Sequence, residues 1–257
     1  MKIEWSTGKE DRARIRALVR SQGNNAFVKR RIRNNVDTKY IPEFGRQRFW
    51  KVMVECLLTT QQRAGPDSAV TRFSSVTPFP LDLQECSRTD KVSSFVEDTL
   101  ASFGGMRRTT TIGRQIENNL VWLNNNGWSQ IEGIADELAK CRKREPRTED
   151  IAIERKAANF VAKNLAGFGP KQSRNLWQTL GLLRFEIPID SRITKWLNRK
   201  NFLVKLSAIA LADNNYYEFV MTGIQRLCEK CQILTCVFDA AVFSSFDREW
   251  TEDTLVY

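Results

Sequence analysis

Apolar residues recur along most of this chain at the spacing of α-helices, and this periodicity restricts its fold more than any other feature. Phe49, Val52, Met53, Cys56 and Leu57 follow the i, i+3, i+4, i+7, i+8 pattern of one buried helix face. Alternation with the two-residue period of strands is nearly absent. We therefore predict an all-α fold of roughly ten helices joined by short loops.

The same spacing continues on both sides of this segment. Further helices are predicted over 69–73, 92–103, 112–123, 131–139, 153–165, 203–212, 219–227 and 238–246. Residues 76–83, which contain Pro78 and Pro80, are expected to form a connector. With 257 residues, of which 42% are hydrophobic, the chain can bury a core as one domain or as two closely packed lobes.

The chain is strongly basic. Lys and Arg exceed Asp and Glu, so that the formal net charge is +10 and the pI is near 9.5. This balance indicates a polyanionic partner, most simply nucleic acid, although a soluble protein can also be basic without one. The basic runs within residues 1–48 either contact phosphates or form solvated helix faces.

Histidine is absent, which excludes His-based catalytic triads, His-containing zinc sites and His general bases. Acid–base and nucleophilic chemistry would then fall to Asp, Glu, Lys, Tyr or Cys. The sequence shows no secretion signal and no apolar stretch long enough to cross a bilayer. We therefore expect reduced thiols in the six Cys, a cytoplasmic and nucleoid-associated location, and no membrane partner.

The stretch from Leu165 to Leu197 concentrates the chemically useful side chains. Gly167 and Gly169 permit a tight turn, and Pro170 suits the first position of the helix that follows. The free backbone N–H groups of such a hairpin, with the positive end of the helix, can bind a phosphate without contacting a base. An ordinary turn between two helices is the alternative interpretation.

Lys171 and Asp190 are the two reactive side chains of this stretch. Lys171 lies in the first turn of the second helix, where the helix dipole disfavours its protonated form, so it could attack a sugar C1′ and form a Schiff base. Alternatively it contacts a phosphate or solvent. Asp190 precedes a helix and could act only as its N-cap. Facing Lys171, it could instead stabilise oxocarbenium-like charge and help to deprotonate the nucleophile.

These residues together resemble a known active-site segment. The run L-A-G-F-G-P-K, followed by I-P-I-D with Asp190 nineteen residues after Lys171, is similar to the helix-hairpin-helix-GPD superfamily of DNA glycosylases. The resemblance implies that Gly167, Phe168 and Gly169 bind DNA and that Lys171 and Asp190 are catalytic. Ala166 stands where the family usually has Pro.

Weaker resemblance extends over roughly residues 45–246. Leu57-Leu58-Thr59-Thr60-Gln61 looks like the family segment whose polar side chain fills the space left by a flipped nucleotide. This implies that Gln61 binds DNA, with Gln62 as the competing register. The run 238–244 resembles a late helix that lines the base pocket in the 8-oxoguanine branch, and Phe243 is the candidate stacking aromatic, although such a residue is more often part of a core.

The resemblance also implies a domain organisation. One helical barrel lobe would comprise residues 49–187 and end in the helix-hairpin-helix, and a second lobe would be formed by residues 1–48 together with 188–257. The active-site cleft would lie between the two lobes.

The spacing of the cysteines limits which subfamily of these glycosylases the chain can resemble. Endonuclease III-type members hold an iron–sulfur cluster with four Cys, whereas Cys228, Cys231 and Cys236 offer three at a different spacing and without His nearby. We therefore expect free thiols, no metal and no cofactor. The mammalian-type β-rich N-terminal domain has no counterpart here, so a compact, cluster-free member nearest the 8-oxoguanine branch fits best.

The predicted function is excision of a damaged or modified base from double-stranded DNA by a monomeric glycosylase, with AP lyase activity through a Lys171 Schiff base. An oxidised purine, 8-oxoguanine, is the first-choice substrate. Two alternatives stay open at this point. One is a monofunctional glycosylase for another modified base, including hypermodified phage bases. The other is a non-enzymatic helix-hairpin-helix DNA-binding protein.

Overall fold

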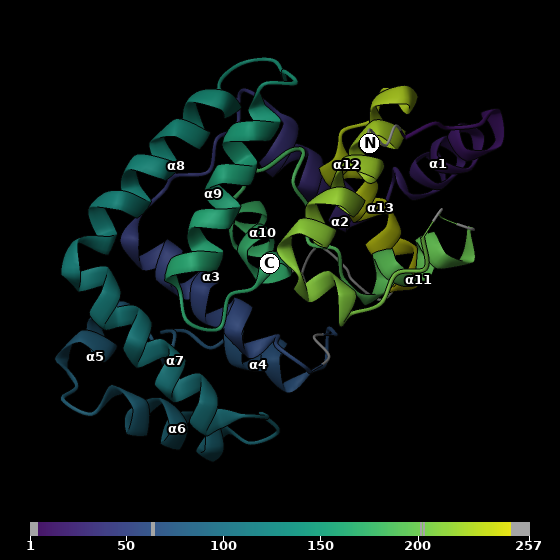
Figure 1. The fold of residues 1–257 in the computed structure, drawn as a ribbon. Coiled ribbons are helices and arrows are strands. Elements are labelled where there is room, and N and C mark those ends of the chain that lie inside the picture. The colour runs from purple at the N-terminus through teal and green to yellow at the C-terminus, as the bar shows by residue number, and fades with distance from the viewer. Residues whose placement is uncertain (1–4, 63–64, 201, 203, 248–257) are drawn as a thin grey trace.

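The structure is a computed structural model that describes residues 5–62, 65–200, 202 and 204–247. Helices and short loops make up this part of the chain, without strands, so the predicted all-α class is confirmed (Figure 1). The α-helices are α1 (Lys9–Gln22), α2 (Ala26–Arg31), α3 (Arg46–Leu58), α4 (Ala69–Ser74), α5 (Leu83–Arg88), α6 (Val92–Phe103), α7 (Thr109–Trp122), α8 (Trp128–Arg142), α9 (Asp150–Asn164), α10 (Pro170–Thr179), α11 (Ser191–Arg199), α12 (Asn214–Cys231) and α13 (Thr235–Phe246).

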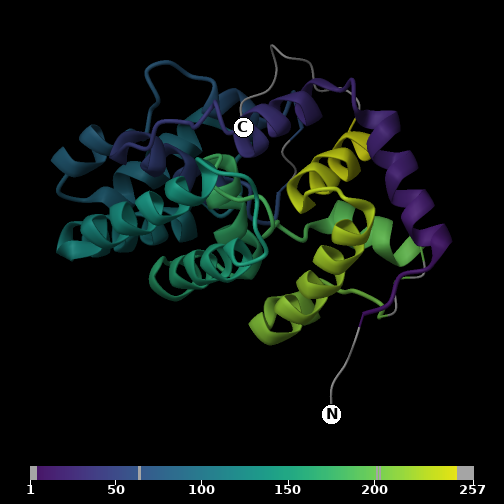
Figure 2. The same cartoon turned by 90° about the horizontal axis from the view of Figure 1, so that it is seen from above.

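Two hydrophobic clusters form the interior. The first contains buried side chains between Phe49 and Leu183, so it joins α3 to α10. The second combines Ile15 of α1 with residues between Ile187 and Val242, so it joins the N-terminal helix to α11, α12 and α13. In Figure 2, α1 packs beside the C-terminal helices and apart from the helices of the first cluster. We propose that each cluster is the core of one lobe.

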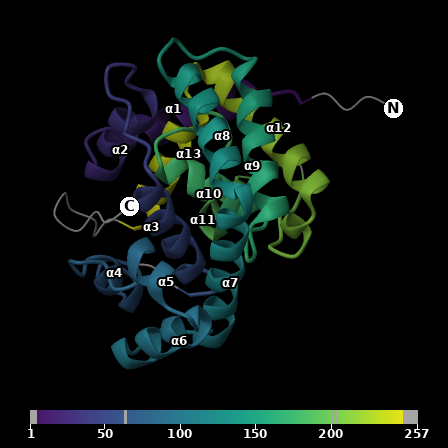
Figure 3. The same cartoon turned by 90° about the vertical axis from the view of Figure 1, so that its left-hand side faces the viewer.

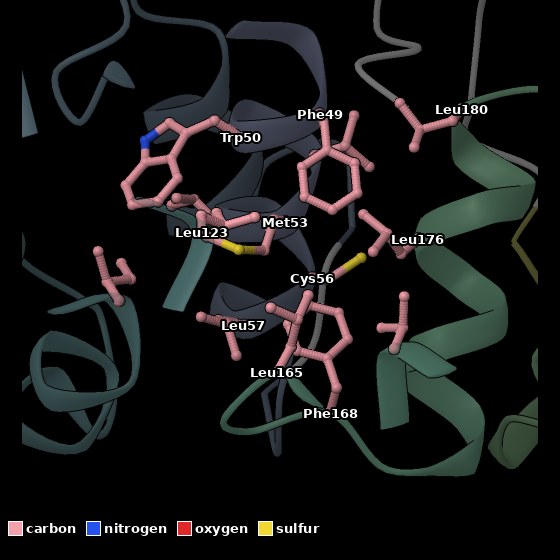
Figure 4. Close-up of a cluster of buried hydrophobic side chains, with 14 of the residues drawn as sticks. Phe49, Trp50, Met53, Cys56, Leu57, Leu123, Leu165, Phe168, Leu176 and Leu180 are labelled. Atoms are coloured by element: carbon pink, nitrogen blue, oxygen red, sulfur yellow. The ribbon is translucent and has the colours of Figure 1, made fainter. Parts of the chain in front are cut away.

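The first cluster is built around α3. Phe49, Met53 and Leu57 are fully buried on the face that the periodicity predicts. Figure 4 shows Cys56 and Leu57 near Leu165 and other side chains of the later helices. Figure 3 shows α6 and α7 side by side at the far end of this group from α1 and α13. Burial of the α3 face therefore fixes where the later hairpin packs.

Two segments differ from the sequence prediction. The helix predicted over 203–212 is wrong in the part that is described, because only a short 3₁₀ turn, Ala210–Ala212, forms there. The Asn198 side chain donates to the carbonyl of Leu206 and accepts from its N–H, which holds that residue in a loop. Leu203 lies outside the described residues. The sequence prediction also omitted α5, which begins where the Asp82 side chain accepts from the N–H of Glu85.

None of the helices in the described ranges combines the length and the apolar character that crossing a membrane requires.

Candidate active site

The hairpin between α9 and α10 requires glycine at one position. Gly167 has φ +85°, and a Cβ there would lie 2.6 Å from Leu57 Cδ2 and 2.7 Å from Gln115 Cδ. The Asn119 side chain accepts from the N–H of Ala166 and donates to its carbonyl, which fixes the turn. Glycine is thus needed for both conformation and space.

The hairpin presents backbone, not aromatic surface, to solvent. Phe168 is only 5% exposed and belongs to the first hydrophobic cluster (Figure 4). Gly167 and Gly169 are exposed, and a Cβ on Gly169 would meet no atom within 4 Å. No hydrogen bond within the described chain uses the N–H of either glycine. Any binding of a phosphate here would therefore use the N–H groups of the two glycines, because the N–H of Phe168 already donates to the carbonyl of Leu165.

Lys171 lies in the first turn of α10 and its side chain is largely enclosed. Burial lowers the pKa of its amine, while the charge of Asp190 acts in the opposite direction. Nζ lies 3.3 Å from Gln172 Oε1. Desolvation thus exceeds the nearby negative charge, and a larger fraction of the amine is neutral than in an ordinary exposed lysine.

Asp190 caps α11 and lies close enough to Lys171 for its charge to act on the pKa of the amine. Its Oδ1 accepts from the N–H groups of Arg192 (2.8 Å) and Ile193 (3.0 Å), as an N-cap does. Its Oδ2 forms an ion pair with Arg192 Nη1 at 2.9 Å. Since the charge of Asp190 also acts on the pKa of Lys171, the structure brings these two predicted residues together. The capping role and the position beside Lys171 are compatible.

The approach to Asp190 is held by side chains from two other helices. Glu154 of α9 accepts from the N–H groups of the three residues 184–186 at 2.8–2.9 Å. Tyr217 of α12 donates its hydroxyl to the carbonyl of Ile187 and accepts from the N–H of Ile189. These contacts fix the extended segment, and with it the direction in which the Asp190 carboxylate points.

Gln61 and Gln62, the two possible registers, differ in the structure. Gln62 is engaged, since its amide donates to the carbonyl of Leu58 and accepts from the N–H of Arg107. Gln61 is exposed and has φ +59°, a left-handed backbone conformation, in the turn after α3. Gln172, the neighbour of Lys171, donates to the carbonyl of Cys56 and so joins α10 to the end of α3.

Phe243 is linked to Asp190 through Arg192, and its ring already contacts two other side chains. Phe27 of α2 stacks on it with a centroid distance of 4.3 Å and an interplanar angle of 18°. The guanidinium of Arg192 lies over the ring, 4.4 Å from its centroid. A flipped base can stack on Phe243 only after one of these two partners moves.

Sequence reasoning missed Arg192 and Asp239. Arg192 links Asp190, Phe243 and Asp247, but an Arg in the first turn of a helix carries no signal of its own. Asp239 is 7% exposed and lies on α13 one turn before Phe243. An acidic residue within an otherwise apolar helix is the signal that could have identified it.

The six cysteines are free and buried. Burial raises the pKa of the Cys56 thiol to about 12, which keeps it protonated beside Lys171. Within the described ranges, no three His, Cys, Asp or Glu residues are grouped in a way that could hold a metal ion. A cavity of about 420 Å³ lies around Arg226 and Thr235, at the other end of α13 from Phe243, and includes neither Lys171 nor Asp190.

Comparison with known proteins gives structural matches but no sequence matches. No protein-family profile and no curated protein matches this chain. The crystal structure of 8-oxoguanine DNA glycosylase from Methanocaldococcus jannaschii matches with a TM-score of 0.65 and 15% identity, over 94% of this chain and 97% of the other. The structure of an 8-oxoguanine glycosylase/lyase from the same organism, in complex with 15mer DNA containing 8-oxoguanine, matches with a TM-score of 0.63 and 14% identity, over 91% and 96%. At this identity the likeness establishes the fold, and the described chain thus has the all-helical fold of these two DNA glycosylase structures.

Proposed function

We propose that this protein is a DNA glycosylase that flips a damaged or modified base out of double-stranded DNA, excises it, and cleaves the strand in an associated AP lyase step. The observation that carries the proposal is the enclosed Lys171 amine, with a pKa lowered by burial, next to the charge of Asp190. If Asp190 only capped a helix and Lys171 had only a structural role, nothing would require the two side chains to lie close together.

Asp190 and Lys171 have different roles in the proposed reaction. The Asp190 carboxylate stabilises the positive charge that develops on the sugar as the glycosidic bond breaks. The neutral Lys171 amine attacks C1′ as the bond from C1′ to the base breaks, and the departing base takes the bonding electrons and then the proton that the new C1′-bound amine releases. The C1′–O4′ bond then opens, O4′ takes a proton from water, and a protonated imine remains between Lys171 and C1′. This imine makes the C2′ proton acidic, so that its loss breaks the C3′–O bond by β-elimination and the 3′ phosphate leaves.

Three features support DNA as the partner. The net charge of +10 favours polyanion binding with strong salt dependence. The exposed N–H groups of Gly167 and Gly169 suit a phosphate. Gln61, which is exposed in the turn after α3, would fill the gap that a flipped nucleotide leaves. The first-choice substrate is 8-oxoguanine, the base named for both structural neighbours, and the protein would act as a monomer in the cytoplasm, on nucleoid DNA.

The test is incubation with duplexes that each carry one modified base, scored for base release and for strand cleavage with and without alkali. Borohydride is added to trap the imine. We expect release of at least one base and a covalent adduct, which Lys171→Ala abolishes and Lys163→Ala, at an exposed lysine of α9, retains.

The outcomes separate the competing functions. Base release without an adduct would indicate a monofunctional glycosylase in which Lys171 is a DNA contact. DNA binding without release of any base, and without an adduct, would contradict the enzymatic proposal and support a helix-hairpin-helix binding protein.

A further inference from the structure

The cavity of about 420 Å³ around Arg226 and Thr235 lies between helices of both hydrophobic clusters. Its walls come from the loop before α9, from α9 itself, from the segment before Asp190, from α12 and from the first residues of α13. Its size is within the range of pockets that hold small-molecule ligands. Because neither Lys171 nor Asp190 lines it, the proposed glycosylase chemistry leaves this cavity without a role.

The N-terminal end of α13 supplies backbone donors at the cavity. Leu234 is the N-cap of this 12-residue helix, and its side chain forms no capping hydrogen bond. The N–H of Cys236 donates to the carbonyl of Arg184, but no hydrogen bond within the described residues uses the N–H of Leu234 or of Thr235. Both residues line the cavity. Two donors are therefore available at the positive end of a helix, where an anion is favoured.

The Thr235 side chain points to a ligand independently of the helix end. Thr235 is only 1% exposed and lines the cavity. Its hydroxyl makes no hydrogen bond to any other residue in the described part of the chain. A buried hydroxyl without a partner is costly, and a ligand that supplies the partner removes this cost.

The charged residues that line the cavity are three arginines and one glutamate, so their balance favours an anion. Arg155 pairs with the buried Glu186 at 3.0 Å. Arg226 pairs with Glu229 at 2.8 Å. Arg147 is exposed, and its guanidinium has neither an ion pair nor a hydrogen bond to another described residue. The cavity therefore has one guanidinium that is available to a ligand.

Phe185 gives the cavity an aromatic wall. Its N–H donates to Glu154 and its carbonyl accepts from Gln225, so its main chain is held on both sides. The Phe185 ring is half-buried and lines the cavity, and no aromatic or cationic group of the described chain stacks on it. Ile151 and Ile233 extend this apolar wall. Such a wall suits a flat ring on the ligand.

We propose that this cavity binds a phosphomonoester joined to a flat ring, of the class of a nucleoside monophosphate. The phosphate accepts from the N–H groups of Leu234 and Thr235, from the Thr235 hydroxyl and from the Arg147 guanidinium, and the ring packs on Phe185. Four donors suit the three terminal oxygens of a phosphate better than the two of a carboxylate. The site is separate from the proposed glycosylase centre and does not depend on that function.

The test is isothermal titration calorimetry with adenosine 5′-monophosphate, adenosine and inorganic phosphate. Wild type is compared with Arg147→Ala, Thr235→Val and Arg20→Ala, each checked for helical content by circular dichroism. Arg20→Ala is the matched control, because it also removes one exposed arginine, but from α1 and outside the cavity. The titrations are repeated with saturating undamaged duplex DNA, which would occupy a phosphate site at the hairpin.

We expect wild type to bind the nucleotide with a dissociation constant below about 1 mM, and adenosine or phosphate alone at least roughly tenfold more weakly. Arg147→Ala should weaken nucleotide binding roughly tenfold, as loss of a charge-assisted hydrogen bond does. Thr235→Val should weaken it roughly two- to tenfold, the effect of one neutral hydrogen bond. Arg20→Ala should stay within about twofold of wild type, since salt screens a distant exposed charge. Duplex DNA should leave the affinity unchanged.

Four results would overturn the inference. They are no binding of the nucleotide to wild type, equal affinity for the nucleotide and adenosine, unchanged affinity in Arg147→Ala, and loss of nucleotide binding when duplex DNA is present. Arg147 is exposed and its guanidinium has no partner in the described chain, so its variant keeps the test decisive even if Thr235→Val does not fold. Base excision and borohydride trapping are measured separately, so a failure of either proposal is distinguishable from a failure of the other.

Discussion

The proposed catalytic pair and the contact between α2 and α13, in which Phe27 stacks on Phe243 and Arg31 pairs with Asp239, are assembled in opposite ways. Lys171 and Asp190 come from one continuous segment, with the rest of α10, a turn and an extended strip between them. Phe27 and Arg31 come from near the N-terminus and meet residues from near the C-terminus. The proposed chemistry therefore depends on residues that are close in sequence, whereas the contact between α2 and α13 depends on residues that only folding brings together.

If this separation is correct, changes to the catalytic pair should affect all substrates alike. Asp190→Asn should lower base excision roughly 100-fold or more, as loss of a transition-state charge partner does, without changing the order of preferred bases. Asn is itself a good N-cap, so α11 should remain folded. The measurement is single-turnover excision with at least two modified bases.

Asp213→Asn provides the matched control, because Asp213 caps α12 by accepting from the N–H of Tyr216 and has no place in the proposed chemistry. It should excise each base at the wild-type rate. A change of base preference in Asp190→Asn would contradict the separation between chemistry and recognition.

Local encoding also predicts a strong dependence on the hairpin glycine. Gly167→Ala should lower the free energy of unfolding by about 2–4 kcal/mol, because the new Cβ adds overpacking to a positive φ. Chemical denaturation followed by circular dichroism gives this value. Gly133→Ala, in α8 with open space around its Cβ, should be neutral or stabilising by up to about 1 kcal/mol. Similar losses for the two variants would show that the turn is not specially constrained.

The smallest expected effect is a shift in pH dependence within the catalytic pair. Only the neutral amine forms an adduct, so trapping on abasic DNA should rise with pH through the pKa of Lys171. Asp190 raises this pKa and Arg192 lowers it. The midpoint of trapping should therefore move to lower pH in Asp190→Asn and to higher pH in Arg192→Gln. Shifts of the same sign in both variants would contradict this electrostatic account.

The features predicted well from sequence are those set by neighbours along the chain. The α3 face follows from the 3.6-residue period, and the proximity of Lys171 to Asp190 follows from one motif. The predicted helix over 203–212 failed because one side chain, Asn198, holds Leu206 in a loop, which no periodicity registers. The choice between Gln61 and Gln62 likewise depends on a hydrogen bond to Arg107, 45 residues away.

The residues around Phe243 were harder to predict from the sequence for the same reason. Arg192 and Asp239 matter because of partners brought to them by folding, such as Phe243 and Arg31. Phe243 was predicted as a stacking aromatic, but no pattern in the sequence indicates that Phe27 and Arg192 contact its ring. A single sequence shows which chemistry a side chain can perform, but it does not show which residues will contact that side chain in the fold.

Tyr217 couples the position of Asp190 to the second hydrophobic cluster. It ties the extended segment before Asp190 to α12, whose side chains belong to the second hydrophobic cluster, whereas α10, which carries Lys171, is anchored in the first through Leu176 and Trp177. The two proposed catalytic groups are therefore held by different hydrophobic clusters, and their alignment depends on the packing between these clusters. We expect heating that loosens this packing to lower the proposed glycosylase activity before the helical content falls.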